Sequence, residues 1–206
     1  MITESGLSRR ELFKRAGIAG AAIFAMPELS RVLNIRRELF AQTRTLTPSE
    51  KTTLTAICAR IIPTDESGPG AVDAHAPEYI DHALSGPLAG SRQAYSEGLA
   101  AIDAAAQQKF KAPFAKLPPT DQDALLTDVQ DTAFFNLVRG HILQGTFCDP
   151  IYGGNANFVG WDLVGYPGVR LNVTAAEQNM STPAARNHKS AYDYLMFSKT
   201  ETMNGH

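Results

Sequence analysis

The strongest constraint on the fold of this chain is a helix-start signal at residue 47 that leads into an apolar stripe of helical period. Thr47, Pro48 and Glu50 form a capping box with proline at the first helical position, where the missing N–H leaves no bond unmade. Apolar side chains then recur at i, i+3, i+4 and i+7, namely at Leu54, Ile57, Cys58 and Ile61. The pattern predicts an amphipathic helix that ends at Pro63 and buries Cys58 as a small hydrophobic residue.

Helical patterns continue through much of the chain. Further helices are predicted over about residues 76–84, 91–110 and 120–145. Thr120 is the expected N-cap of the last segment, and Asp131 or Thr132 is expected to divide it into two helices. Turn-forming residues separate the segments, in a loop over 63–71 and at Gly86-Pro87. Because no stretch alternates with period two and hydrophobic residues make up 44% of the chain, we expect an all-α body with its own core.

The first 44 residues differ in charge from the rest. They hold eight Lys and Arg against four Asp and Glu, whereas residues 45–206 hold eleven against seventeen. The basic residues precede an uncharged run, Ala16–Met26, which at about 1.5 Å per residue covers about half of the roughly 30 Å hydrocarbon core. A secretory signal is therefore expected in place of a membrane span.

The basic residues themselves resemble the twin-arginine export signal. The residues that carry this resemblance are Ser8, Arg9, Arg10, Leu12, Phe13 and Lys14. We expect the twin-arginine translocase as a partner and the periplasm as the destination. Cleavage stays open, because the small-x-small tripeptides lie inside the apolar run, and retention as a weak anchor is the alternative.

Composition excludes several classes of protein. The chain has 19 Lys and Arg against 21 Asp and Glu, so no basic excess is available and no nucleic-acid partner is expected. Cys58 and Cys148 are the two cysteines, too few for a disulfide-stapled mini-domain or a four-cysteine zinc site. Covalent attachment of a c-type haem is excluded as well, since the sequence holds no C-x-x-C-H.

Candidate catalytic and metal-binding groups are few, so we expect this chain to be no enzyme and assign it no catalytic, cofactor-binding or metal-ligating residue. The sequence holds neither an H-E-x-x-H motif nor a G-x-S-x-G elbow. His75 and His82 would lie about 10 Å apart along an ideal helix and are expected as surface or capping residues. Four aspartates are expected on a solvated helix face, with cation binding as the alternative: Asp121, Asp123, Asp128 and Asp131.

The segment 146–168 holds five glycines, the single tryptophan and several other aromatic residues. Prolines that restrict φ and glycines open to positive φ predict a long structured loop. Two compatible interpretations follow. In the first, the loop folds under the helices with Trp161 and Phe158 as its own small core; in the second, the loop is a recognition surface, because tryptophan and tyrosine are enriched at interface hot spots.

Particular motifs in this segment are similar to those of the gluconate 2-dehydrogenase subunit 3 family. They are Asp149-Pro150-x-Tyr152-Gly153-Gly154-Asn155, Gly160-Trp161 and Gly165-Tyr166-Pro167-Gly168, preceded by Ile61-Ile62-Pro63-Thr64-Asp65 and Tyr95-x-x-Gly98-Leu99. The resemblance spans roughly residues 47–168. It implies a non-catalytic small subunit of a membrane-associated sugar, polyol or gluconate dehydrogenase complex.

The resemblance also implies the partners and cofactors. The partner is a large FAD-binding dehydrogenase subunit of the glucose-methanol-choline type, often with a multihaem cytochrome c as a third subunit. FAD would lie in the large subunit and haem c in the third, with no cofactor in this chain. In that family the small subunit carries the twin-arginine signal and the flavin subunit is exported bound to it. The complex would hold this chain at the periplasmic side of the cytoplasmic membrane.

The predicted partner interface follows the loop. Its residues are Cys148, Asp149, Pro150, Tyr152, Gly153, Gly154, Asn155, Trp161, Tyr166, Pro167 and Gly168. For Cys148, in a chain bound for an oxidising compartment, three states stay open: a disulfide to the large subunit, a disulfide to Cys58, and a free thiol.

The sequence predicts three parts of the chain. They are a signal segment (1–44), a helical subunit-3-like domain (45–170) and a C-terminal extension (171–206). The fold class is all-α, a small helical domain with a long Gly- and aromatic-rich structured loop and extended N- and C-terminal segments. An aromatic cluster at 192–197 raises the hypothesis that the extension wraps the partner. The alternative function is a stand-alone exported helical binding protein or enzyme with its ligand in the Gly-rich loop.

Overall fold

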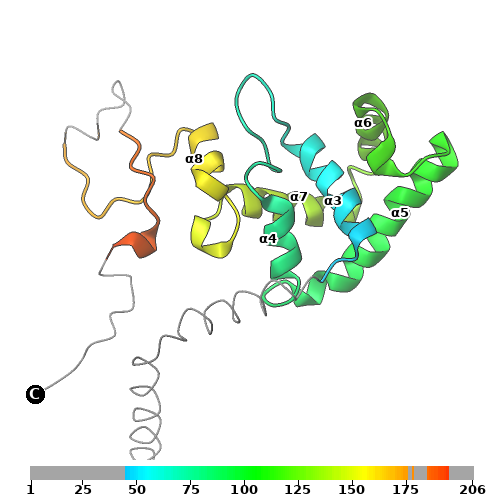
Figure 1. Cartoon of the computed structure of the whole chain (residues 1–206), viewed down its shortest axis with the longest axis horizontal. Helices are drawn as coiled ribbons and strands as arrows, with labels where there is room; N and C mark the ends of the chain where they lie inside the picture. The colour runs from blue at the N-terminus through cyan, green and yellow to red at the C-terminus, as the bar shows by residue number, and fades with distance from the viewer. Residues whose placement is uncertain (1–44, 176–177, 179–184, 195–206) are drawn as a thin grey trace, which may run out of the picture. The chain divides into compact units, whose positions relative to one another are not determined.

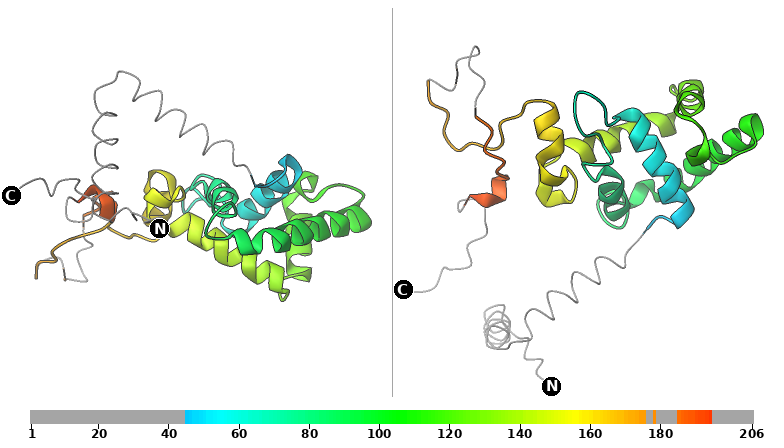
Figure 2. Two further views of the ribbon diagram at one scale, coloured as in Figure 1. Left: turned by 90° about the horizontal axis from the view of Figure 1, so that it is seen from below. Right: turned by 45° about the horizontal axis from the view of Figure 1, so that its top comes forward.

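The computed structural model describes residues 45–175, 178 and 185–194, which belong to one unit of the chain, Arg44–His206. Figures 1 and 2 show the described residues in colour. The predicted export-signal residues, Ser8 to Lys14, and the last three residues of the aromatic cluster, 195–197, lie outside the described residues.

The predicted all-α fold class is confirmed. Over the described ranges the elements are six α-helices and several short 3-10 helices, with no strand. The α-helices are α3 (Pro48–Ile61), α4 (Ala76–Ala83), α5 (Arg92–Phe110), α6 (Pro119–Asp128), α7 (Ala133–Phe147) and α8 (Val159–Leu163).

The first helix begins as its sequence predicts. The Thr47 side chain accepts a hydrogen bond from the Glu50 backbone at 3.2 Å, and the Glu50 carboxylate accepts one from the Thr47 backbone at 2.7 Å. Arg92 of α5 donates to both oxygens of the same carboxylate, at 2.8 and 3.0 Å. Burial favours the neutral acid, but these bonds outweigh it, so the pKa of Glu50 lies below its ordinary value.

The predicted helical segment 120–145 forms two helices, α6 and α7, as expected. The predicted start of the first one needs a correction. Thr132 separates α6 from α7 and caps α7, because its side chain accepts the Phe135 N–H at 3.2 Å. Thr120 is not the N-cap of α6. Pro119 already has a helical φ and occupies the first helical position, so Pro118 becomes the cap residue and Thr120 lies exposed in the first turn.

One continuous core joins α3, α4, α5, α6 and α7. Its largest fully buried side chains include Leu54, Ile57, Ile80, Tyr95, Leu99, Phe114, Val138 and Ile142. Cys58 is fully buried among them, as predicted. Gly145 of α7 lies so close to α4 that a Cβ there would be 3.0 Å from the Ala76 Cα. This contact fixes the C-terminal end of α7, from which the Gly-rich segment departs.

Candidate partner-binding surface

The Gly-rich segment after α7 contains more helix than its composition predicts. It holds two 3-10 helices, η4 (Pro150–Tyr152) and η5 (Ala156–Phe158), before α8. Figure 1 shows α7 leading into this segment, which is drawn in yellow. Left-handed backbone at Asn155, Asn157 and Phe158 makes the reversal between α7 and α8.

Asn155 is the central residue of this reversal. Its side chain is fully buried, with Nδ2 donating to the Cys148 carbonyl at 2.9 Å and Oδ1 accepting the Gly160 N–H at 2.7 Å. Its own backbone N–H donates to the Gly145 carbonyl at 2.7 Å. One amide side chain therefore joins the end of α7 to the start of α8.

Two glycines permit the backbone to approach α7 this closely. A Cβ at Gly154 would collide with the Gly145 carbonyl, and a Cβ at Gly160 would collide with the Thr146 carbonyl. Both obstacles are backbone atoms of α7, which cannot swing aside as a side chain can. The glycines at these two positions are thus explained by packing.

Trp161 lies inside the segment. Its side chain is 6% exposed, and its indole N–H donates to the Phe147 carbonyl at 3.0 Å. The rings of Phe158 and Tyr166 pack against it, with centroids 5.3 and 4.8 Å away. This arrangement agrees with the interpretation of the loop as a unit with its own aromatic core.

We predict that Asn155→Ala destabilises the protein by about 2–6 kcal/mol, because the Gly160 N–H and the Cys148 carbonyl would each lose a partner, at about 1–3 kcal/mol per buried group. Urea unfolding measures the change. Asn157→Ala is the matched control, since Asn157 has the same left-handed backbone and an exposed side chain. Equal losses in both variants would show that the backbone conformation, and not the buried hydrogen bonds, accounts for the effect.

The outer face of the same segment is apolar. One groove is lined by Tyr79, Pro87, Leu143, Gln144, Phe147, Cys148 and Tyr152. A second groove is lined by Phe147, Trp161, Val164 and Tyr166. Phe147 belongs to both, so the two grooves are neighbours on one surface, which we call the loop face. Its most exposed apolar side chains are Tyr152 at 57% and Val164 at 61%.

Comparison with known proteins now identifies the family. The sequence model described as gluconate 2-dehydrogenase subunit 3 matches residues 48–168, from the first residue of α3 to the end of the Gly-rich segment. The chain belongs to this family. A search of curated proteins gave no match, and neither did a search of solved structures. As the family description indicates, this subunit-3 chain is an accessory subunit of a multi-subunit dehydrogenase complex.

The predicted interface residues of this subunit-3 chain divide by burial. Those exposed are Tyr152, Gly153 and Tyr166; those half-buried are Cys148, Asp149, Pro150 and Pro167; those buried are Gly154, Asn155, Trp161 and Gly168. The buried set shapes the segment from within, and the exposed set is open to a partner. Binding of a partner by any of them stays a prediction.

Cys148 ends α7 and lines the first groove. Its thiol is free and half-buried, and burial raises its pKa above the ordinary value of a cysteine. Cys58 is free and fully buried in the helical core. The structure therefore lacks the Cys58–Cys148 disulfide considered from sequence, and a disulfide to another subunit stays a prediction.

The histidines and aspartates considered as metal ligands from the sequence form no cluster of three or more among the described residues. His75 and His82 are exposed, as expected. Asp123 pairs with Arg60 at 2.7 Å, and Asp128 pairs with Lys109 at 2.9 Å. Within the described ranges, no three His, Cys, Asp or Glu side chains gather as a metal site, and no helix is long and apolar enough to span a membrane.

Among the histidines that the structure describes, His141 is buried. Nδ1 of His141, on α7, forms a hydrogen bond with the Tyr95 hydroxyl at 3.0 Å, and the two rings are parallel. Burial lowers the pKa of His141, so the neutral ring is favoured. The pair lies in the helical core, where it satisfies two polar groups of α5 and α7.

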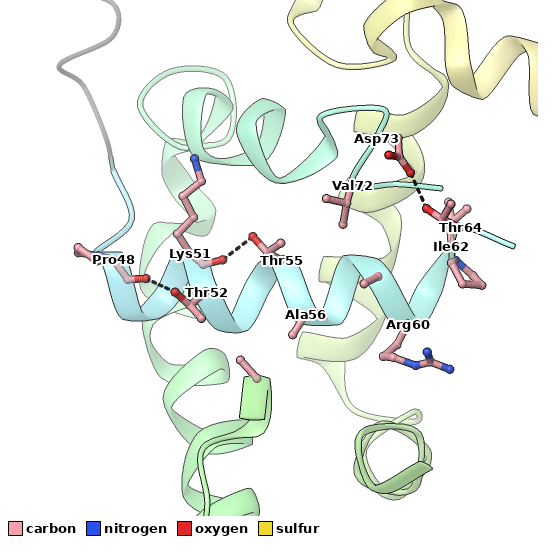
Figure 3. Close-up of a pocket in the computed structure, with 13 residues that line it drawn as sticks. Pro48, Lys51, Thr52, Thr55, Ala56, Arg60, Ile62, Thr64, Val72 and Asp73 are labelled. Carbon is pink, nitrogen blue, oxygen red and sulfur yellow. Dashed lines mark hydrogen bonds between the residues drawn. The ribbon is translucent and has the colours of Figure 1, made fainter. Parts of the chain in front are cut away.

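Two hollows lie away from the loop face. One follows α3, and Figure 3 shows its lining residues, with Thr64 bonded to Asp73. Its other charged side chains are paired as well, Lys51 with Glu78 and Arg60 with Asp123. The other lies between α5 and α7 and is apolar, with Ala94, Gly98, Ala101, Phe134 and Leu137 among its lining residues. This second hollow provides a control for the loop face.

Sequence reasoning missed part of the loop face. Tyr79 and Pro87 come from around α4, far from the Gly-rich segment in sequence. Leu143 and Phe147 form an i, i+4 pair on α7 beside the buried stripe of that helix, which is the signal that could have found them. No sequence signal marks Val164, because the exposure of its side chain depends on how α8 packs against the rest of the segment.

Proposed function

We propose that this chain is the non-catalytic small subunit of a flavin-dependent dehydrogenase of the glucose-methanol-choline type, acting on a sugar, polyol or gluconate. It binds the large FAD-containing subunit through the loop face and enables the folding and twin-arginine co-export of that subunit to the periplasm. A multihaem cytochrome c completes the complex at the cytoplasmic membrane. Activity resides in the flavin subunit.

The observation that carries this proposal is the family match over residues 48–168. It spans the helical core and the whole Gly-rich segment, so the elements that form the loop face all lie inside it. The export part of the proposal rests on the arginine-containing motif at residues 8–14.

The loop face has the physical character of a docking surface. Tyr152, Val164 and Tyr166 expose apolar area, while Asn155 and Trp161 hold the backbone beneath them in place. A rigid support reduces the entropy lost on binding, and aromatic side chains on it supply large contact area. The charged residues of the hollow along α3 are, by contrast, already paired within the chain.

The test is co-purification of the natively expressed, tagged protein, with mass spectrometry and an absorbance spectrum of the product. A stoichiometric large subunit with flavin absorbance is expected. A colourless monomer without a companion would contradict the proposal and favour the stand-alone binding protein.

We further predict that Val164→Asp weakens the binding of the flavin subunit at least tenfold, about 1.4 kcal/mol, because it places an unpaired carboxylate in the apolar contact. Titration of the purified flavin subunit measures the affinity. Ala101→Asp is the matched control, since it places the same charge at an exposed position of the apolar hollow between α5 and α7. Loss of binding in Ala101→Asp with retention in Val164→Asp would move the docking surface to α5 and α7.

A further inference from the structure

Residues 185–194, part of the C-terminal extension, lie against the Gly-rich segment (orange to red in Figure 1). Asp149 holds their far end: its carboxylate accepts the Ser190 hydroxyl at 2.7 Å and the Ala191 N–H at 3.1 Å. Ser190 is buried and also forms a capping box with Asp193 at the start of η7 (Ala191–Asp193). A residue predicted to bind a partner thus binds the chain's own C-terminal extension.

A second set of bonds holds the middle of the segment. The Asn187 N–H donates to the Pro167 carbonyl at 2.9 Å, and the Val169 N–H donates to the Lys189 carbonyl at 3.2 Å. The Tyr194 hydroxyl donates to the Val169 carbonyl at 2.7 Å. Gly168 lies between these bonds with φ +96°, and a Cβ there would collide with the Asn187 side chain. The missing side chain of Gly168 makes room for the extension.

A third set of contacts involves α8. Asp162 accepts from Arg186 Nη1 at 3.0 Å and from His188 Nε2 at 2.8 Å. The His188 ring stacks on Phe158, with centroids 5.1 Å apart and planes 8° from parallel. Phe158 also packs on Trp161, so the extension continues the aromatic core of the segment.

These contacts place one aromatic side chain beside the loop face. Tyr192 follows directly after Ala191 and is 46% exposed. The Asp149 carboxylate that accepts the Ala191 N–H also accepts the Ile151 N–H at 3.1 Å, and Tyr152, which lines the first groove, follows Ile151 directly. The exposed rings of Tyr152 and Tyr192 are therefore neighbours, although they lie forty positions apart in the sequence.

We infer that residues 185–194 complete the docking surface for the flavin subunit, with Tyr192 as a contact residue. The inference rests on the proposed function, and it assigns binding to residues beyond the 48–168 range of the family match. Over this range the extension packs on its own chain and presents Tyr192 with Tyr152, and wrapping of the partner by the extension stays a prediction.

Three observations support this assignment. Nine hydrogen bonds or ion pairs join the segment 185–194 to residues of the Gly-rich segment and to Val169, so its backbone is fixed before a partner arrives. Tyr192 keeps its ring exposed although its own N–H is bonded to Ser190 at 3.1 Å. Its neighbour Tyr152 borders a groove that already exposes apolar side chains. An exposed aromatic ring on a fixed backbone is typical of interface hot spots.

The experiment titrates the flavin subunit with the full-length protein and two variants. Tyr192→Ala is expected to weaken binding at least tenfold, because it removes the ring from the contact. Tyr192→Phe keeps the ring and removes the hydroxyl, so its affinity is expected to stay within about threefold of the wild type. Circular dichroism melting of all three proteins should give the same transition temperature, since the Tyr192 side chain is exposed.

The outcomes separate this inference from the proposed function. If the wild-type chain binds no flavin subunit, the proposed function itself fails. If the wild type binds and Tyr192→Ala binds equally well, the docking surface ends at the loop face and the inference is wrong. Ser190→Ala gives an independent check: it loosens residues 185–194 from Asp149 without altering the Tyr192 ring, and an intermediate loss of affinity is expected. An unchanged affinity in both Ser190→Ala and Tyr192→Ala overturns the inference.

Discussion

Replacing Trp161 with alanine is expected to lower the free energy of unfolding by about 3–5 kcal/mol, the usual cost of truncating a buried large aromatic side chain. The indole is 6% exposed and packs between Phe158 and Tyr166. Its removal leaves a cavity in the segment and frees the Phe147 carbonyl, which now accepts the indole N–H. Urea unfolding with a circular dichroism signal measures the change.

The controls separate stability from binding. Trp161→Phe keeps much of the ring volume and should lose less stability than Trp161→Ala. Tyr152→Ala removes an exposed ring and should change stability by less than about 0.5 kcal/mol, as surface substitutions do, while weakening partner binding. If Trp161→Ala unfolds like the wild type and loses only the partner, then Trp161 is a contact residue as the sequence suggested, and its burial in the free chain has no energetic weight.

Replacing both Arg9 and Arg10 with lysine is expected to abolish export of this chain and of its flavin subunit together. The expectation follows from the proposed co-export: the adjacent arginines are the recognised part of the signal, and the flavin subunit depends on the signal of its partner. Cell fractionation with detection of both subunits measures the result. Flavin subunit in the periplasm of the double variant would disprove the carrier role.

The chain provides its own control for this experiment. Residues 36–40 repeat the sequence Arg-Arg-Glu-Leu-Phe of residues 9–13, but Ala41, Gln42, Thr43 and Arg44 follow in place of a long uncharged apolar run. Replacing Arg36 and Arg37 with lysine makes the same chemical change outside the signal context. Export should be normal in that variant. Loss of export there as well would show that arginine pairs matter for another reason.

Local patterns predicted the helices well and their boundaries less well. The capping box at Thr47 and the stripe through Cys58 are complete within one stretch of sequence, and the structure confirms both. The start of α6 was wrong because Pro118 and Pro119 offered two adjacent positions for a helix start, and the cap formed without a side-chain bond. The division at Thr132 was correct because its side chain caps α7 locally.

The position of the Gly-rich segment was predictable from the sequence, but the orientation of its side chains was not. Motif resemblance located it at Asp149–Gly168, and the family match confirms the family over that range. Composition could not show that Trp161 and Asn155 point inward while Tyr152 and Val164 point outward. That distinction depends on positive φ at Phe158 and Asn157, which bulky or polar residues adopt only when surrounding contacts impose it.

The sequence by itself determined the all-α class, the helical segments, the family and the position of the Gly-rich segment, because each depends on periodicity or motifs within a short stretch of chain. The tertiary structure decided which side chains of that segment are available to a partner. It brought α4 to Gly145 and Ser190 to Asp149, contacts between residues far apart in the sequence. Such contacts form only after the helices pack, so no local pattern encodes them, and they set the surface that the proposed partner would meet.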